Sequence, residues 1–193
     1  MNIITVKNDK YQLLKTKATT ISITKEGLAE AKEIADEMIK TITPLMPAAG
    51  LAAPQIGISK QVFIYSWDRT LENMEVAINP SFESVDNKTQ DSWEACFSTI
   101  LGEPPYSIAY LPRYTTILVT YTTLNGSTKK MILEAFGAKV FQHEWDHLQG
   151  ITNISRDNAQ VKEFMTVDEI VKFTDEERKT KDKVTYLPPK FVE

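Results

Sequence analysis

The 193-residue sequence predicts an α+β fold in which antiparallel strands and hairpins surround a central helix. Three observations lead to this prediction. Residues 25–42 and 134–148 each repeat apolar side chains at helical spacing. Residues 115–133 contain two β-rich segments on either side of Asn125-Gly126, a pair that tolerates positive φ at a two-residue turn. Together they indicate helices combined with at least one hairpin.

The first half of the chain is expected to contain one helix and two strands. Thr24 suits the N-cap position of the first helix. The segment that follows at 46–57 is small, apolar and interrupted by Pro and Gly, so it predicts a tight, buried loop. Apolar segments from Gln61 and Glu75 predict strands, and Asn79-Pro80 is expected to end the second one.

The second half centres on the helix of residues 134–148. Gly150 is its expected C-cap. A short helix at 167–173 is expected before the charged run DEERKTKDK, which we interpret as a solvated surface. We therefore expect residues 1–193 to form a single domain with a C-terminal helical and charged tail from about residue 160.

Composition and charge argue against several classes of function. The formal net charge is −4 and no block of five Lys or Arg occurs, so no direct nucleic-acid partner is expected. No apolar run approaches the roughly 18 to 20 residues that cross a bilayer, so no membrane association is expected. The N-terminus lacks the features of a signal peptide, and the single cysteine cannot form an internal disulfide. These features predict a cytoplasmic protein, in which the N-x-S/T sites are chance matches.

The strongest chemical signal is the segment His143-Glu144-Trp145-Asp146-His147. Residues four apart lie on the same face of a helix, so both imidazoles can bind one metal ion while Glu144 sits beside it. These are the only two histidines in the chain, which makes their spacing hard to attribute to chance. The pattern predicts a metal site.

A catalytic metal usually has three protein ligands and one open position for water. Zinc peptidases with this helix motif often take a downstream His or Glu, but no third His exists, and Glu163 and Glu169 carry no accompanying pattern. Cys96 is the remaining soft ligand. A lone cysteine is as a rule a small buried apolar residue, so the residues alone leave the third ligand open.

Three ordered motifs resemble the peptide deformylase family. They are A-A-G-L-A-A-P-Q at 48–55, E-A-C-F-S at 94–98 and Q-H-E-W-D-H at 142–147. The resemblance runs from the first helix to about Asp157. It implies an α+β fold with antiparallel strands and hairpins around a central metal-binding helix, and a metal held by Cys96, His143 and His147.

The resemblance also implies roles at the reacting centre. Glu144 would be the general base and then the general acid. The side-chain amide of Gln55 and the backbone N–H of Phe97 would stabilise the oxyanion. Gly50 and the neighbouring Ala49 would offer backbone groups to an extended peptide.

Other residues would shape the pocket or orient the ligands. Phe136 and Val140 lie about two turns and one turn before His143, so they could line the methionine pocket or simply pack in the core. Glu94 and Arg113 resemble a paired carboxylate and guanidinium that would hold the strand bearing Cys96. Asp146 could act in the same way or face the surface.

The function implied is removal of the N-formyl group from the initiator methionine of nascent polypeptides near the ribosome, with release of formate. One divalent ion is implied, Fe²⁺ in the cell, with Zn²⁺, Ni²⁺ or Co²⁺ able to occupy the same ligands. Two alternatives remain at this stage. One is a zinc endopeptidase; the other is a deformylase-like protein with an altered substrate or lost turnover that binds peptides.

The chain departs from the family pattern beside the substrate. Ala48 and Ala95 replace glycines of the first two motifs, and Thr99-Ile100 follows Ser98 in place of the usual Val/Ile-Pro. A glycine at position 95 could supply positive φ or room for a ligand's backbone. The segment from Phe97 to Arg113 is also a few residues longer than usual. We expect these changes to affect substrate range more than metal binding.

Overall fold

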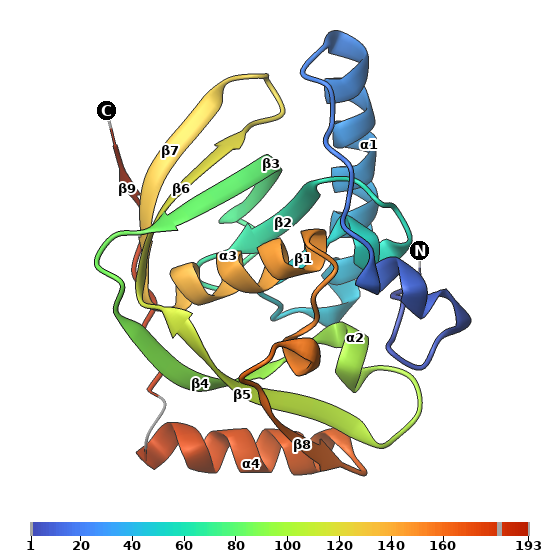
Figure 1. Cartoon of the computed structure of the whole chain (residues 1–193), viewed down its shortest axis with the longest axis vertical. Helices are drawn as coiled ribbons and strands as arrows, with labels where there is room; N and C mark the ends of the chain where they lie inside the picture. The colour runs from blue at the N-terminus through green and yellow to red at the C-terminus, as the bar shows by residue number, and fades with distance from the viewer. Residues whose placement is uncertain (1, 181–182, 193) are drawn as a thin grey trace.

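A computed structural model describes residues 2–180 and 183–192, and it contains two antiparallel sheets on either side of one helix (Figure 1). The larger sheet has the strand order β1-β2-β3-β6-β7-β9 and the smaller one β4-β5-β8. The predicted fold class is confirmed. The strands are β1 (Gly50–Ala52), β2 (Val62–Ser66), β3 (Met74–Ser84), β4 (Thr89–Ala95), β5 (Tyr106–Tyr114), β6 (Thr116–Thr122), β7 (Thr128–Glu134), β8 (Gln160–Phe164) and β9 (Lys190–Phe191).

The helices lie at different depths within the molecule. The helix α3 lies between the two sheets, whereas α1 and α4 lie outside them (Figure 1). None of the helices in the described ranges is long and apolar enough to cross a membrane. The α-helices are α1 (Lys25–Ile42), α2 (Phe97–Ile100), α3 (Ala135–Leu148) and α4 (Val167–Thr180), and the 3-10 helices are η1 (Asp9–Lys15), η2 (Thr43–Leu45), η3 (Ala53–Ile56) and η4 (Asn153–Ser155).

The core fixes α3 against the larger sheet. The ring of Phe141 meets those of Phe63 and Tyr65 edge to face, with centroids 4.9 and 5.2 Å apart. Such pairs add about 0.5–1.5 kcal/mol each to the burial of their apolar surface. This contact holds the opposite face of α3, which carries the two histidines, towards the smaller sheet.

Two predictions in the first half of the chain were wrong in part. The expected loop at 46–57 contains the short strand β1 and the 3-10 helix η3. Strand β3 does not end at Asn79-Pro80 but continues to Ser84. A register shift between Ile78 and Ser81 takes up the proline, and Asn79 has φ 48°. A proline is tolerated in a strand at such a bulge.

The hairpin of β6 and β7 is confirmed, but its turn is longer than two residues. Thr123 N–H donates to the Ser127 carbonyl, so Leu124, Asn125 and Gly126 form a three-residue loop. Only Gly126 has positive φ, at 83°. Three-residue hairpin loops combine a type I turn with one left-handed residue, which is the arrangement here.

The tail is more ordered than its composition predicts. The helix α4 begins at Val167 as expected but runs to Thr180, through most of the charged segment. Phe173 fastens it to the outer face of the smaller sheet by ring contacts with Trp93 and Phe164, at centroid distances of 5.0 and 5.4 Å. The charged side chains therefore cover the solvent side of an anchored helix.

Candidate metal centre

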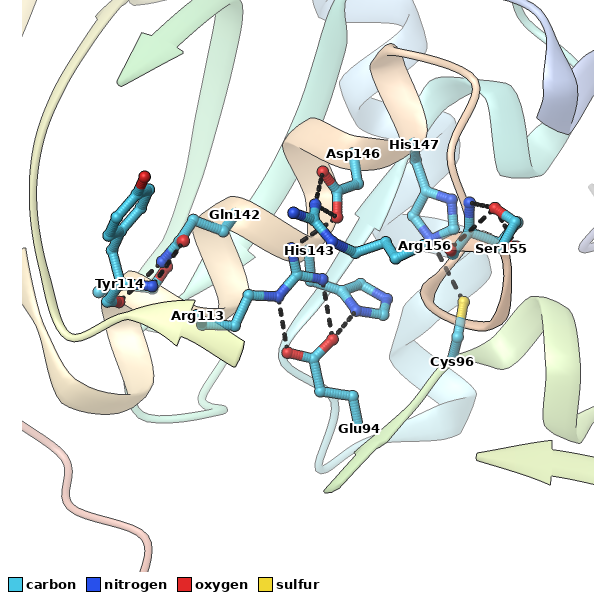
Figure 2. Close-up of polar contacts among 12 residues, drawn as sticks. Glu94, Cys96, Arg113, Tyr114, Gln142, His143, Asp146, His147, Ser155 and Arg156 are labelled. Atoms are coloured by element: carbon cyan, nitrogen blue, oxygen red, sulfur yellow. Dashed lines mark hydrogen bonds and ion pairs between the residues drawn. The ribbon is translucent and has the colours of Figure 1, made fainter. Parts of the chain in front are cut away.

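The three predicted ligands come together at the end of β4 and on one face of α3. Cys96 directly follows β4, and His143 and His147 lie one helical turn apart. One donor atom from each residue lies within 4.8 Å of the others. The Cys96 Sγ is 3.2 Å from the His147 Nε2, and Figure 2 shows the two side chains pointing at each other. The third ligand, which the residues alone left open, is therefore within reach.

The ring orientation of His143 suits metal binding. Its Nδ1 is 2.9 Å from Glu94 Oε2 (Figure 2). A proton on Nδ1 donated to this carboxylate leaves the lone pair of Nε2 for a metal ion. For His147, the buried Nδ1 has no hydrogen-bond partner within the described residues, while its Nε2 faces the cysteine. The donor set and its geometry fit a divalent ion.

A buried ion-pair network lies behind the ligands. Arg113 makes two bonds to Glu94, from Nε at 2.8 Å and from Nη2 at 2.9 Å, and its Nη1 lies 2.5 Å from Asp146 Oδ2. Burial alone would raise the pKa of Glu94, but Arg113 and His143 hold it well below its usual range. Asp146 also accepts a bond from Arg156 at 2.7 Å, so it faces the interior and not the solvent. This network connects β4, β5 and α3.

Sequence reasoning missed two further supports of this network. The amide of Asn153 donates to the Glu94 backbone carbonyl at 3.0 Å and is buried, which accords with reading its N-x-S site as a chance match. Gln142 exchanges bonds of 2.9 and 3.0 Å with the backbone of Tyr114, and so fixes α3 to the end of β5. Gln142 belongs to the third motif, so the sequence contained a sign that it matters. No motif or pattern in the sequence pointed to Asn153 or Arg156.

Glu144 is buried beside the ligands and in contact with β1. Its Oε2 has no hydrogen-bond partner in the described part of the chain. Burial raises the pKa of this carboxyl to about 7. A group whose pKa lies near the working pH can both accept and donate a proton. The position and chemistry of Glu144 are those of an acid–base residue.

Gly50 leaves the space that Glu144 occupies. A Cβ at position 50 would lie 2.6 Å from Glu144 Oε1 and 2.8 Å from its Cδ. We therefore expect Gly50→Ala to displace the carboxyl group and to lower kcat by about 100-fold, the lower end of what a positioned acid–base group contributes. Metal content, measured by elemental analysis, should stay at the wild-type value. The control is Gly57→Ala. A Cβ at Gly57 would meet no atom closer than 3.6 Å, but the φ of 89° disfavours alanine, so this variant should be less stable while kcat of its folded fraction stays unchanged. Equal kcat in Gly50→Ala and wild type would contradict the assignment.

The predicted oxyanion donors, Gln55 and Phe97, lie next to Cys96. Gln55 Nε2 is 3.5 Å from Cys96 Sγ and 3.2 Å from Ser98 Oγ, and its Oε1 accepts the Ala52 N–H at 2.8 Å. The amide of Gln55 thus points at the metal centre with its orientation fixed. Phe97 is the first residue of α2, so its N–H belongs to the groups that a helix leaves without an internal partner.

A cleft of about 480 Å³ opens onto these groups. Ala49 and Gly50 line it from the side of β1, and Glu94 and Ala95 line it from β4. Each of these strands is at the end of its sheet, so each has an edge without a neighbouring strand. Other lining residues include the predicted Phe136 and Val140, which also belong to the core cluster around α3. The cleft can therefore hold an extended peptide between two strand edges.

The structure limits what the alanine at position 95 changes. Ala95 is paired with Ile108 in β4 and is not among the described residues with positive φ. A glycine is therefore not required there for its conformation. Ala95 can therefore affect substrate binding only by its size, because its exposed methyl group lines the cleft.

Part of the cleft wall was not predicted. Arg69 and several residues of α4 line it, among them Ile170, Val171 and Arg178. Nothing in the motifs points to them. The segment that predicts a helix at 167–173 contains Ile170 and Val171, but it ends before Arg178, which lies in the charged run.

Known proteins that match this chain belong to the family that the three motifs resemble. The family model described as polypeptide deformylase matches residues 1–163. Peptide deformylase 2 of Bacillus anthracis is 38% identical over 143 residues, 68% of this chain and 75% of that protein. Peptide deformylase 2 of Ralstonia nicotianae is 41% identical over 110 residues, but the alignment spans only 53% of this chain and 59% of that relative.

The solved structures that match this chain are peptide deformylases as well. The crystal structure of peptide deformylase from Thermotoga maritima superposes with a TM-score of 0.67 at 30% identity, covering 81% of this chain and 97% of that one. A structure of a class I type b peptide deformylase from Acinetobacter baumannii bound to Met-Ala-Ser gives a TM-score of 0.67 at 26% identity, covering 81% and 97%. The zinc endopeptidase and the inactive binding module are not favoured by these matches. The family implies a divalent metal, Cys96, His143 and His147 form a group that could hold it, and the chain belongs to the polypeptide deformylase family.

Proposed function

We propose that this enzyme removes the formyl group from the N-terminal methionine of newly made polypeptides and releases formate. The observation that carries the proposal is the meeting of Cys96, His143 and His147 next to a buried Glu144, at the floor of a cleft between two strand edges. Hydrolysis of an amide needs a nucleophile, a proton carrier and donors for the oxyanion. The residues around the cleft would hold the ion that activates a water as nucleophile, and they supply the proton carrier and the oxyanion donors.

The roles of the residues follow from their positions. A divalent ion held by Cys96 and the two histidines would lower the pKa of a bound water towards neutrality and polarise the formyl carbonyl. Glu144 takes the proton of the attacking water and then gives it to the departing amine. Its pKa of about 7 in the protein alone would be lowered by the charge of the ion. The amide of Gln55 and the N–H of Phe97 donate to the developing oxyanion.

Substrate binding is proposed at the strand edges. Backbone groups of Gly50 on one side and of Ala95 on the other pair with an extended peptide, as in strand addition. Ala49, whose carbonyl accepts the Ser66 N–H, forms the adjoining wall of the cleft. Phe136 and Val140 provide an apolar surface for the methionine side chain, and Glu94, Arg113 and Asp146 orient the ligands. We propose Fe²⁺ as the ion in the cell, a cytoplasmic location, and nascent chains near the ribosome as the substrate.

The test combines metal analysis with turnover. Wild-type protein loaded with Fe²⁺ or Ni²⁺ without oxygen should bind one ion per chain and hydrolyse formyl-Met-Ala-Ser. Changes in the groups that only orient metal ligands cost about 10- to 100-fold in affinity. Loss of a ligand in Cys96→Ala should cost more, and should abolish turnover at the same time.

A matched control lies at the other end of β4, the strand that precedes Cys96. Thr89→Ala alters an exposed residue at the start of β4 and should leave metal content and turnover as in wild type. If Cys96→Ala binds one ion with wild-type affinity, the ligand assignment is wrong. If the loaded wild type binds metal but hydrolyses no formyl peptide, the proposed reaction is wrong.

A further inference from the structure

One end of the cleft is positively charged and lies beyond the metal centre. Phe136 precedes His143 by seven residues on α3, which corresponds to roughly 10 Å along the helix. The guanidinium of Arg69 lies over the Phe136 ring, with its Cζ 4.7 Å from the centroid. Arg178 lines the same cleft from α4. Two segments that are far apart in the sequence thus bring arginines to the end of the cleft near the start of α3.

Arg69 is held in place but not neutralised. It is partly buried, has φ 63°, and its buried Nε has no hydrogen-bond partner within residues 2–180 and 183–192. No carboxylate in the described ranges forms an ion pair with it. Burial lowers the pKa of Arg69, and the nearby charge of Arg178 lowers it further, while Tyr186 acts in the opposite direction. A partly buried guanidinium without a counter-ion costs free energy that a bound anion would recover.

Arg178 has only a weak partner of its own. Its Nη1 is 3.4 Å from Asp175 Oδ1, and both side chains are largely exposed. Exposed pairs of this kind contribute little and exchange readily with water or with another anion. Asp175 also lines the cleft and offsets part of the charge of Arg178. The uncompensated positive charge therefore centres on Arg69.

We propose that Arg69 and Arg178 form a carboxylate-binding subsite that favours substrates with an acidic residue shortly after the formylated methionine. This inference rests on the proposed function. An extended chain advances about 3.3 Å per residue and turns every second side chain to the same side. The third side chain therefore follows the methionine side chain past Phe136, and it reaches Arg69 roughly 10 Å from the metal centre. Arginine binds carboxylates through two parallel hydrogen bonds, and Arg69 presents such a fork from a rigid stacked position.

The subsite also gives α4 a role. The family model ends at residue 163, so α4 and Arg178 lie outside the part of the chain that matches the family. Phe173 fixes α4 against Trp93, which itself lines the cleft. Because α4 is anchored through this contact, Arg178 is available in the cleft before a substrate arrives.

The experiment compares two peptides that differ only in charge. Formyl-Met-Ala-Glu-amide and formyl-Met-Ala-Gln-amide have no C-terminal carboxylate, so the third side chain is the one anionic group that distinguishes them. With the metal-loaded wild type, kcat/KM should be about tenfold higher for the Glu peptide, the size expected of a hydrogen-bonded charge. The ratio should fall towards one in Arg69→Gln and in Arg178→Gln, and Arg69→Lys should restore part of it.

The control is Lys179→Gln, which removes an exposed positive charge from α4 next to Arg178 but does not line the cleft. It should keep the wild-type ratio at 0.15 M salt, where distant surface charges are screened. Equal kcat/KM for the two peptides in wild type, or an equal fall of the ratio in Lys179→Gln, would overturn the subsite.

A second readout separates this inference from the proposed function. Calorimetric binding of Met-Ala-Glu-amide and Met-Ala-Gln-amide to the metal-loaded protein needs no turnover. If neither formyl peptide is hydrolysed but the Glu peptide binds about tenfold more tightly, the proposed reaction fails and the subsite stands. If both formyl peptides are hydrolysed and the two products bind equally, the reaction stands and the subsite fails.

Discussion

Replacement of Glu144 by Gln is expected to leave the metal bound and to lower kcat by about 100- to 10 000-fold, the range contributed by a positioned acid–base group. Glutamine has the shape of glutamate but cannot take up a proton. The side chain lies beside the ligands without being one of them, in space that a side chain at position 50 would take. Single-turnover kinetics on formyl-Met-Ala-Ser, with metal quantified in the same samples, measure the effect.

The matched control for this variant is Glu163→Gln, an exposed residue of β8 far from the ligands in sequence, for which no role is proposed. It should retain wild-type kcat. Near-normal hydrolysis by Glu144→Gln would mean that another group carries the proton. Loss of the ion from Glu144→Gln would instead mean that Glu144 holds the metal.

The largest effect on stability is expected for Arg113→Met. Removing one partner of a buried ion pair costs about 3–5 kcal/mol, because the remaining charges stay buried without compensation. Here both Glu94 and Asp146 would lose their bonds to Arg113. Urea denaturation of the wild type and the variant, analysed at constant slope, gives the change in the free energy of unfolding.

The comparison variant is Arg156→Met. Arg156 is 37% exposed and shares Asp146 with Arg113, so its removal leaves that carboxylate with a partner. We expect it to destabilise the protein by less than half as much as Arg113→Met. Equal losses for the two variants would show that Asp146, and not the link between Glu94 and Arg113, is the centre of the network.

The sequence predicted the centre of the fold better than its rim. Helix α3 could be predicted because apolar residues recur at helical spacing through 134–148 and the two histidines, four residues apart, share a face. The hairpin of β6 and β7 could be predicted because its register depends on local turn chemistry, although the loop is one residue longer than expected. Strand β3 was cut short, because a bulge that accommodates Pro80 is fixed by the neighbouring strand β6 and not by the proline itself.

The residues of the site also differ in how well the sequence predicts them. The ligands and Glu144 lie in short motifs whose spacing has chemical meaning. The contacts of Asn153, Arg156 and Arg69 depend on how distant segments meet, and no local pattern records that. The length of α4 was underestimated for a related reason: its charged residues argue for solvent exposure, while the ring of Phe173 on Trp93 supplies the tertiary contact that holds the helix.

The network around Arg113 has a consequence for how the ion is acquired. Asp146 and Gln142 fix α3 to β5 on either side of His143, and Glu94 fixes the end of the strand that carries Cys96. The backbone segments that carry all three ligands are thus fixed by contacts that involve no metal. The entropy of ordering them is lost during folding of the chain and not when the ion binds. In this respect the site is the opposite of a zinc finger, whose chain is unfolded until the ion arrives. We therefore expect the chain to stay folded when the ion is removed.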